Sequence, residues 1–594
     1  MIDAARDTAE FRGEEIPVAI VGMASRTAAS EDGKSLWDFI SGSECAIKDV
    51  PPERLPRVDP GPVRTGAVRA ALLDDAAAFD AEFFHISRRM AAWMDPHQRV
   101  LLELTWHALE DAAIAPHALR GTDVAVFAAA GTSDYRELMV AADQVDGAAF
   151  PGTLMTFIAN RISYQFDWTG PSYVIDAACA SGLSVLAPAV AGLRSREFPL
   201  AAVMAANITT NGFYMSSAYR AGALSPTGRS VPFSSQHDGY IRGDGAACLI
   251  LKRLDDALAD GDPVQAVIRG IGLAHNGRAG GLTGSAAEPQ TRLLARVARA
   301  SGVPLHSLGH LEAHGTGTGG DASEIEGLAA ALAGQDGGPG QSAGGPDGRL
   351  WVGTLKANIG HLEMAAGLLG VVKSVLILRH GLIPAIPGLR ERNPDIEWGD
   401  LPIALADHSV DWPADGAVRR LAVNSFGLGG ALACALLEDG PDRPAGPDPA
   451  AEGAVAVPIS AVRPESLRLL AAELERALAD RKPDCLPALA STLQAGREGL
   501  AERRVLVVDD LHGLRDALAA VATGSRHSAV AAADDPAALA ALAPDAAADA
   551  ARWLSDADVV WTVPPGPGPV RLSGLPGHPF RRRRHWFDTR RPAN

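Results

Sequence analysis

The chain has 594 residues, with 54 Lys and Arg against 71 Asp and Glu, so its formal net charge at pH 7 is −17. This balance argues against a nucleic-acid-binding protein, which needs a basic face to neutralise phosphate. The apolar fraction of 47% and the charged fraction of 21% are typical of a globular chain and exclude a disordered one.

The cysteines are scattered and form no CxxC pair: Cys45, Cys179, Cys248, Cys434 and Cys485. An odd, dispersed set argues against a disulfide framework and a structural zinc site, so we expect no bound metal. The polar tail at residues 1–15 lacks the apolar core of a secretion signal. The longest apolar run, around residues 368–378, is interrupted by Lys373 and is too short to span a membrane. These features predict a cytoplasmic protein.

Residues 16–438 alternate short β-branched runs with longer helical patterns, which predicts a layered α/β body. Within it, the Gly-rich stretch 334–349 is expected to be a surface loop. Clustered Pro and Gly at 439–453 indicate a linker. Residues 454–563 then carry two strand-like runs and two helical patterns, which predict a small α/β unit.

The C-terminal tail, residues 564–594, contains four consecutive arginines between aromatic residues, Arg581–Arg584. Basic and aromatic side chains together could stack on and pair with a nucleic acid. In a chain of net charge −17, a solvated strip or one paired with carboxylates of the same chain is the better explanation.

The first candidate for chemistry is residues 170–186, GPSYVIDAACASGLSVL, where a strand-like run leads to Cys179 and then to a helical pattern. A cysteine at the first turn of a helix is exposed to unpaired backbone N–H groups, which would lower its pKa toward a usable thiolate. The alternative is an inert, buried cysteine, which is common for isolated thiols.

The second candidate is residues 310–326, HLEAHGTGTGGDASEIE, which contains a GxGxxG pattern. That pattern is found in dinucleotide sites, but the acidic residue expected about 20 positions later is absent. The glycines would instead let the backbone approach His314, placed at a strand end where a base or hydrogen-bond donor is useful.

The third candidate is residues 355–370, LKANIGHLEMAAGLLG, with Lys356 and His361, followed by NSFGLGG around Phe426. Each histidine alone could be purely structural. Together, DAACASG, EAHGTGTGGD, KANIGH and NSFGLGG resemble the Cys, His and His motifs of polyketide synthase β-ketoacyl synthase (ketosynthase) domains of the thiolase-like superfamily. The resemblance extends along nearly the whole chain.

This resemblance implies a thiolase-like five-layered α/β/α/β/α duplicated core over residues 16–438, followed by the small α/β linker domain at 454–563. The tail at 564–594 would pack back on the ketosynthase domain. The family acts as a homodimer, so a homodimer is expected here as well.

The resemblance also assigns roles. Cys179 would accept an acyl chain from the phosphopantetheine thioester of a separate acyl carrier protein, with no cofactor bound to the chain itself. The backbone N–H groups of Cys179 and Phe426 would form the oxyanion hole. His314 and His361 would activate the second substrate, with Lys356 as a supporting charge.

Some positions depart from the family pattern. Where the family usually has TACSS, residues 177–181 are AACAS, which loses hydroxyls around the nucleophile, and Ala431 to Cys434 replace the usual TNAH. No acyltransferase, carrier or reductase motif follows, so the chain resembles a stand-alone ketosynthase that receives its substrate in trans.

The altered motifs and the stand-alone form favour intramolecular aldol-type cyclisation with lactone-forming release, as in the γ-lactam-β-lactone bicyclase of salinosporamide-type pathways. The alternatives are decarboxylative Claisen condensation with a malonyl-type extender and an inactive, carrier-docking dimeric scaffold.

Overall fold

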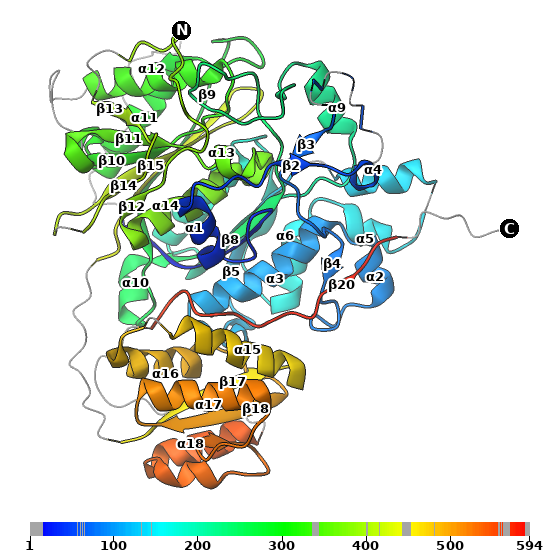
Figure 1. The fold of residues 1–594 in the computed structure, drawn as a ribbon, viewed down its shortest axis with the longest axis vertical. Coiled ribbons are helices and arrows are strands. Elements are labelled where there is room, and N and C mark those ends of the chain that lie inside the picture. Colours follow the sequence, from blue (N-terminus) through cyan, green and yellow to red (C-terminus); the bar gives the residue numbers. More distant parts are fainter. Residues whose placement is uncertain are drawn as a thin grey trace.

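The computed structural model (Figure 1) describes residues 16–587 apart from 56–57, 60, 62, 65, 132, 144, 335–343, 399–401, 415, 442–452, 480, 556–558, 560 and 562–570. The predicted tail 1–15 and most of the predicted linker 439–453 therefore lie outside the described residues. So do most of the Gly-rich loop 334–349 and both ends of the C-terminal tail 564–594.

One eleven-stranded sheet forms the centre of the larger body, in the order β13-β11-β10-β15-β16-β9-β1-β8-β7-β5-β6. Its first half consists of β1 (Val18–Thr27), β5 (Val124–Ala129), β6 (Ser172–Ile175), β7 (Leu200–Asn207) and β8 (Gly245–Arg253). Its second half consists of β9 (Ala266–His275), β10 (Leu308–Glu312), β11 (Leu350–Gly353), β13 (Ile403–Leu405), β15 (Arg420–Phe426) and β16 (Ala431–Glu438).

The two halves repeat one topology. From the centre outward the first half runs β1-β8-β7-β5-β6 and the second runs β9-β16-β15-β10-β11. In both, the second strand is antiparallel to its neighbours, whereas the outer three are parallel. The halves join where β1 pairs with β9. The duplication implied by the motifs is therefore present in the strand order.

Helices complete five layers around and between the two halves. The helices α3 (Pro96–Asp111) and α6 (Phe157–Phe166) cover the outer face of the first half, and α11 (Ala287–Ser301) and α12 (Gly320–Ala333) cover that of the second. The middle layer contains α8 (Leu186–Arg194) and α14 (Ala366–His380), which contact strands of both halves. This is the predicted α/β/α/β/α arrangement.

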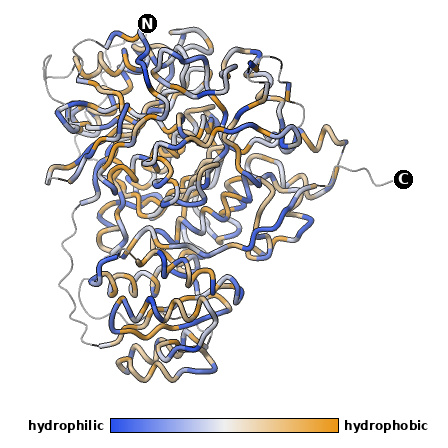
Figure 2. The backbone as a smooth tube through the Cα atoms, in the orientation of Figure 1, coloured by the Kyte–Doolittle hydropathy of each residue, from blue (hydrophilic) through white to orange (hydrophobic). Residues whose placement is uncertain are grey.

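Alternation along the strands explains why this sheet is buried on both faces. In β5, Val124, Val126 and Ala128 pack with the outer helices, while Ala125, Phe127 and Ala129 belong to the core around α8 and α14. Strands covered on both faces appear in the sequence as continuous apolar runs, because neither face is left for polar side chains. Figure 2 shows this hydrophobic centre.

The remaining short elements of the larger body are α1 (Gly33–Ser41), α2 (Arg88–Trp93), α4 (Asp134–Ala141), α5 (Ala149–Thr153), α7 (Ser181–Ser184), α9 (Phe213–Arg220), α10 (Leu254–Ala259), α13 (Lys356–Ile359), β2 (Lys48–Asp49), β3 (Arg69–Ala70), β4 (Ala78–Phe79), β12 (Leu382–Ile383) and β14 (Val410–Asp411). No helix among the described residues is both long and apolar enough to cross a bilayer.

A separate three-stranded antiparallel sheet follows, with β18 (Glu502–Val508) between β17 (Val455–Ala461) and β19 (Val530–Ala531). One of its faces packs against α15 (Pro464–Ala477), α16 (Leu486–Ala495) and α17 (Leu511–Thr523). Its other face packs against α18 (Pro544–Leu554). This small unit lies below the larger body in Figure 1.

The C-terminal segment from Arg571 runs back along the larger body (red in Figure 1), where β20 (Arg583–Arg584) pairs with β4. Arg582 forms ion pairs with Glu103 at 2.7 Å and Glu31 at 2.6 Å. Carboxylates of the same chain thus pair with this basic strip, as expected for a chain of this net charge.

Candidate active site

A tight turn between β6 and α7 presents Cys179. Ala178 adopts the left-handed conformation (φ 50°), which is strained for a residue with a side chain. Ser181 Oγ holds the turn by accepting from the Ala177 N–H at 2.7 Å and donating to the Ala178 carbonyl at 2.6 Å. Cys179 as a whole residue is partly exposed at the tip of this turn, whereas its sulfur is desolvated.

Small residues bring the two halves of the sheet together at this turn. A Cβ at Gly182 would lie 2.8 Å from Leu368 N, so α7 and α14 touch backbone to backbone. From the second half, Ser425 Oγ donates to the Cys179 carbonyl at 2.7 Å. The nucleophile candidate is therefore tied to both halves of the fold.

His314 lies just beyond the end of β10, on a loop held by two buried carboxylates of α12. Glu324 accepts from the backbone N–H groups of His314 and Gly315 at 2.8 and 2.9 Å. Asp321 accepts from those of Thr316 and Gly317. The N–H groups of residues 314–317 thus bind the chain's own carboxylates, which would repel a dinucleotide phosphate at this part of the motif.

His361 follows α13, and its ring lies close to that of His314. The ring centroids are 5.5 Å apart and the planes nearly perpendicular, at 82°. The Phe426 N–H donates to His314 Nδ1 at 3.2 Å, and the Glu363 N–H donates to His361 Nδ1 at 3.1 Å. Because Nδ1 accepts in each neutral ring, the proton is on Nε2, and both imidazoles are hydrogen-bond donors there.

Both histidines are neutral for an electrostatic reason. Burial lowers the pKa of each well below 6.5, and the Lys356 ammonium lowers it further. Burial likewise lowers the pKa of Lys356, while the carboxylates of Glu312 and Glu324 oppose that shift. The charge of Lys356 therefore acts on both imidazoles.

The pKa of Cys179 differs from the prediction. Burial raises it to about 12, with a further increase from the Glu363 carboxylate, although the backbone N–H of Leu428, Lys356 and the Cys179 N–H lower it. Desolvation therefore outweighs the N–H groups, and the resting cysteine is a thiol.

The Phe426 N–H, which was predicted to line the oxyanion hole, donates to His314 Nδ1 in this structure. The N–H groups that act on the Cys179 sulfur are those of Leu428 and Cys179 itself. Gly429 and Gly430, with φ of 101° and 95°, shape the loop after Leu428. The Leu428 N–H is thus nearer to the sulfur than the sequence indicated.

The sequence did not reveal an ion pair beside the site between a buried arginine and a partly buried glutamate. Arg242 donates to Glu363 at 2.6 Å, and Glu363 has a left-handed φ of 41°. Tyr240 OH also donates to Glu363. The available signal was the position of Glu363 two residues after His361 in the same motif. Within the described ranges, no three His, Cys, Asp or Glu side chains gather in a way that would hold a metal ion.

The raised thiol pKa predicts how alkylation of Cys179 depends on pH. Iodoacetamide reacts with the thiolate, whose fraction rises about tenfold per pH unit below the pKa. We therefore expect the labelling rate of Cys179 to rise with unit slope in log rate from pH 7 to 9.5, measured by peptide mass spectrometry. A rate that levels off near pH 7 would contradict the raised pKa.

Comparison with known proteins identifies this arrangement. The chain matches the beta-ketoacyl synthase N-terminal domain over residues 15–257 and the beta-ketoacyl synthase C-terminal domain over residues 265–390. It belongs to the β-ketoacyl synthase family. The ketoacyl-synthetase C-terminal extension matches residues 393–507 of this ketosynthase. The chain is therefore a condensing enzyme, a transferase that acts on acyl groups.

Similar proteins come from polyketide assembly. The ketosynthase is 37% identical over 527 residues to 5-methyl-1-naphthoate synthase of Streptomyces sahachiroi, covering 87% of the chain and 29% of that protein. It is 37% identical over 514 residues to erythronolide synthase EryA3 of Saccharopolyspora erythraea, covering 85% of the chain and 16% of that protein. The chain thus spans less than a third of each of these two relatives.

Solved ketosynthases share the fold. The oxazolomycin ketosynthase domain OzmH KS7 of Streptomyces albus JA3453 superposes with a TM-score of 0.82 at 30% identity, covering 96% of this chain and 99% of that one. A ketosynthase from module 6 of the bacillaene synthase of Bacillus subtilis 168 gives 0.83 at 27% identity, covering 96% and 100%. The predicted thiolase-like fold is confirmed.

Proposed function

We propose that this ketosynthase takes an acyl chain from a carrier-bound phosphopantetheine thioester onto Cys179 and extends it by decarboxylative Claisen condensation. The observation that carries the proposal is that His314 and His361 each accept a backbone N–H at Nδ1, which leaves Nε2 as the protonated nitrogen of each neutral ring. The carrier protein would be a separate chain or domain. The chain itself would need no bound cofactor.

The first step is a thiol exchange. The Cys179 sulfur attacks the thioester carbonyl, the bond from that carbonyl to the carrier sulfur breaks, and the cysteine proton leaves with the carrier thiol. The negative charge that develops on the carbonyl oxygen would be stabilised by the N–H groups of Cys179 and Leu428. This arrangement compensates for the high pKa of the resting thiol, because attack and proton release are coupled.

The second step favours decarboxylation over proton abstraction. In an extender of the malonyl type, loss of CO₂ leaves the bonding electrons as an enolate, whose oxygen two Nε2–H donors would stabilise. The enolate carbon then attacks the acyl carbonyl, and the Cys179 sulfur departs and regains a proton. Cyclisation instead needs a base for the α-proton, and buried imidazoles with lowered pKa are weak bases.

Several of the residues that depart from the family pattern, and that favoured cyclisation, are buried in the structure. Leu432, Ala433 and Cys434 are buried in β16 within the central sheet, and Ala180 is buried in the core below the nucleophile turn. These four residues pack the interior rather than face a substrate, whereas Ala177, Ala178 and Ala431 are partly exposed. Cyclisation is therefore the second candidate.

An isotope-labelled extender distinguishes condensation from cyclisation. The ketosynthase would be incubated with an acyl carrier protein loaded with an acyl chain and a second loaded with malonyl labelled with ¹³C at its free carboxyl. Condensation predicts ¹³CO₂ and a carrier-bound chain longer by two carbons. A released product isobaric with the acyl group, with no ¹³CO₂, would instead support cyclisation. Absence of any acyl transfer would leave only the scaffold hypothesis.

The role of Leu428 gives a specific prediction. Leu428→Pro removes the backbone N–H, so acylation of Cys179 should fall by about 10²- to 10³-fold in kcat, the loss typical for one oxyanion donor. The matched Leu428→Ala variant keeps the N–H, and the leucine side chain is 67% exposed, so its rate should stay within about twofold. Stopped-flow release of the carrier thiol measures both, and equal rates would contradict the assignment.

We also propose a homodimer formed through β6, the edge strand of the large sheet. An unpaired edge strand is a ready template for pairing with a second chain. Exposed aromatic side chains surround it: Tyr164, Tyr173, Phe213 and Tyr214.

Light scattering should give twice the monomer mass of 61.7 kDa for the wild-type protein, and Tyr173→Lys should shift the measured mass toward that of the monomer. A monomeric wild-type protein would contradict this proposal.

A further inference from the structure

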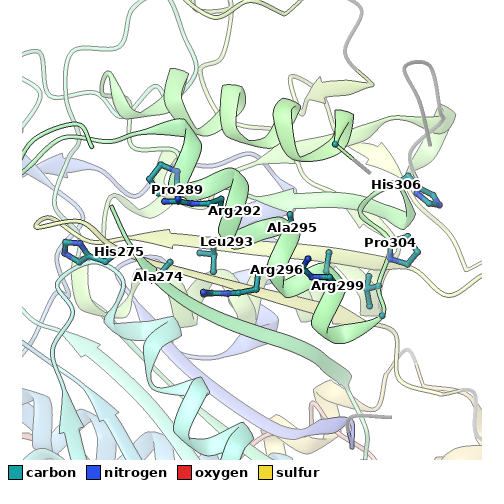
Figure 3. Close-up of a pocket in the computed structure, with 14 residues that line it drawn as sticks. Ala274, His275, Pro289, Arg292, Leu293, Ala295, Arg296, Arg299, Pro304 and His306 are labelled. Carbon is teal, nitrogen blue, oxygen red and sulfur yellow. The ribbon is translucent and has the colours of Figure 1, made fainter. Parts of the chain in front are cut away.

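A groove runs along the outer face of α11, on the far side of the second half of the sheet from the middle helices. Three arginines, Arg292, Arg296 and Arg299, occupy it at spacings of four and three residues, which place them in one row. Figure 3 shows this row, with His275 toward one end and His306 toward the other. The groove holds a volume of about 1030 Å³.

The charge of this groove is opposite to that of the whole chain. Among the residues that line it, all within the described part of the chain, three are arginine, two are histidine and none is Asp or Glu, whereas the net charge of the chain is −17. A local concentration of positive charge on an acidic protein attracts an acidic partner to that place and repels it elsewhere.

Little of this positive charge is neutralised by the chain itself. Arg292 pairs with Glu288 at 3.1 Å, but both side chains are about two-thirds exposed, so the pair is weak and can open. Arg296 donates to the Leu273 carbonyl, which leaves its charge uncompensated. The Arg299 side chain makes no hydrogen bond or ion pair with any described residue, although its carbonyl accepts from the Gly302 N–H. The groove therefore presents two guanidinium charges that lack a carboxylate partner.

One end of the groove reaches the loop that carries Leu428. His275 ends β9, and a Cβ at Gly430 would lie 3.0 Å from its ring. The Asn276 N–H donates to the Gly430 carbonyl at 2.8 Å. Gly430 is two residues beyond Leu428, whose N–H acts on the Cys179 sulfur. A partner lying in the groove would thus be next to the loop that lines the nucleophile.

We propose that this groove docks an acidic helix of the acyl carrier protein, an inference that rests on the proposed function. The helix α11 has 15 residues and is about 22 Å long, so a partner helix could lie along it and match the arginine row with carboxylates at similar spacing. A nucleic acid would extend beyond this groove over the acidic remainder of the protein, which would repel it. A short acidic helix would contact only the groove.

The test compares two substrates and two charge-matched variants. Arg296→Glu/Arg299→Glu reverses the charge of the groove. Arg468→Glu/Arg526→Glu makes the same change in charge at exposed positions of the small unit. The substrates are an acidic acyl carrier protein loaded with octanoyl phosphopantetheine and octanoyl-N-acetylcysteamine, which needs no docking. Intact-protein mass spectrometry follows octanoylation in both cases.

We expect the groove variant to lose at least about tenfold in the rate of acylation from the carrier while keeping the wild-type rate with the small thioester. Arg296→Lys/Arg299→Lys should restore carrier transfer, and the control variant should match wild type. Equal loss in both charge-reversed variants, or none in the groove variant, would overturn the docking inference. So would a wild-type protein that accepts the small thioester but not the carrier. Failure of wild type with both substrates would instead refute the proposed function.

Discussion

The Cys179→Ala variant is expected to lose chain extension by at least about 10³-fold, because covalent catalysis through a nucleophile cannot proceed without it. Cys179 is the cysteine whose pKa responds to Lys356 and the Leu428 N–H. Turnover with an acyl-loaded carrier and a malonyl-loaded carrier measures the loss.

Cys45→Ala is the matched control for this variant. Cys45 is exposed, whereas Cys248 and Cys434 are buried in the sheet. We expect the control to turn over at the wild-type rate. Extension by Cys179→Ala at a rate within tenfold of wild type would show that the acyl chain reacts elsewhere or is never transferred to the protein.

The Lys373→Met variant is expected to destabilise the fold by about 3–5 kcal/mol, because it leaves a buried carboxylate without its partner. Lys373 Nζ lies 2.6 Å from Glu312 Oε2, and both side chains are at most 4% exposed. Although burial raises the pKa of Glu312, the Lys373 ammonium and His310 bring it down to about 2. The ion pair therefore keeps the carboxylate charged.

Scanning calorimetry should show a lower melting temperature for Lys373→Met. The double variant Lys373→Met/Glu312→Gln removes both charges and should recover most of the loss, because the amide oxygen can still accept from the Leu355 N–H. Since the pKa of Glu312 is lowered in the fold, the stabilisation by the pair is present above pH 4.5 and is lost as the pH falls toward 2. A melting temperature unchanged in the single variant would contradict this account.

The interrupted apolar run that contains Lys373 shows how far the sequence allowed the fold to be predicted. The run was too short for a membrane span, and it forms α14 in the middle layer. Its charge is explained by Glu312, a residue 61 positions away that the sequence does not pair with it. Local periodicity predicted the layers, and the motifs predicted the duplication, but neither identifies partners across layers.

In the active site, too, the sequence allowed some groups to be predicted and not others. The motifs located the side chains of Cys179, His314 and His361, which the structure brings to one place. Backbone groups were harder to predict: Phe426 and Leu428 are two residues apart, and only the path of the loop decides which N–H reaches the sulfur. The pKa of Cys179 depends on burial by distant segments, so the helix position alone predicted the wrong direction.

Peptide mapping after a single exposure to octanoyl-loaded acyl carrier protein is the most direct test that Cys179 is the acyl acceptor. The wild-type ketosynthase, digested at low pH to preserve thioesters, should carry the octanoyl mass on the peptide that contains Cys179. The mass should be released when malonyl-loaded carrier is added, as the chain leaves on the carrier. An octanoyl mass on any other peptide, or none at all, would contradict the account.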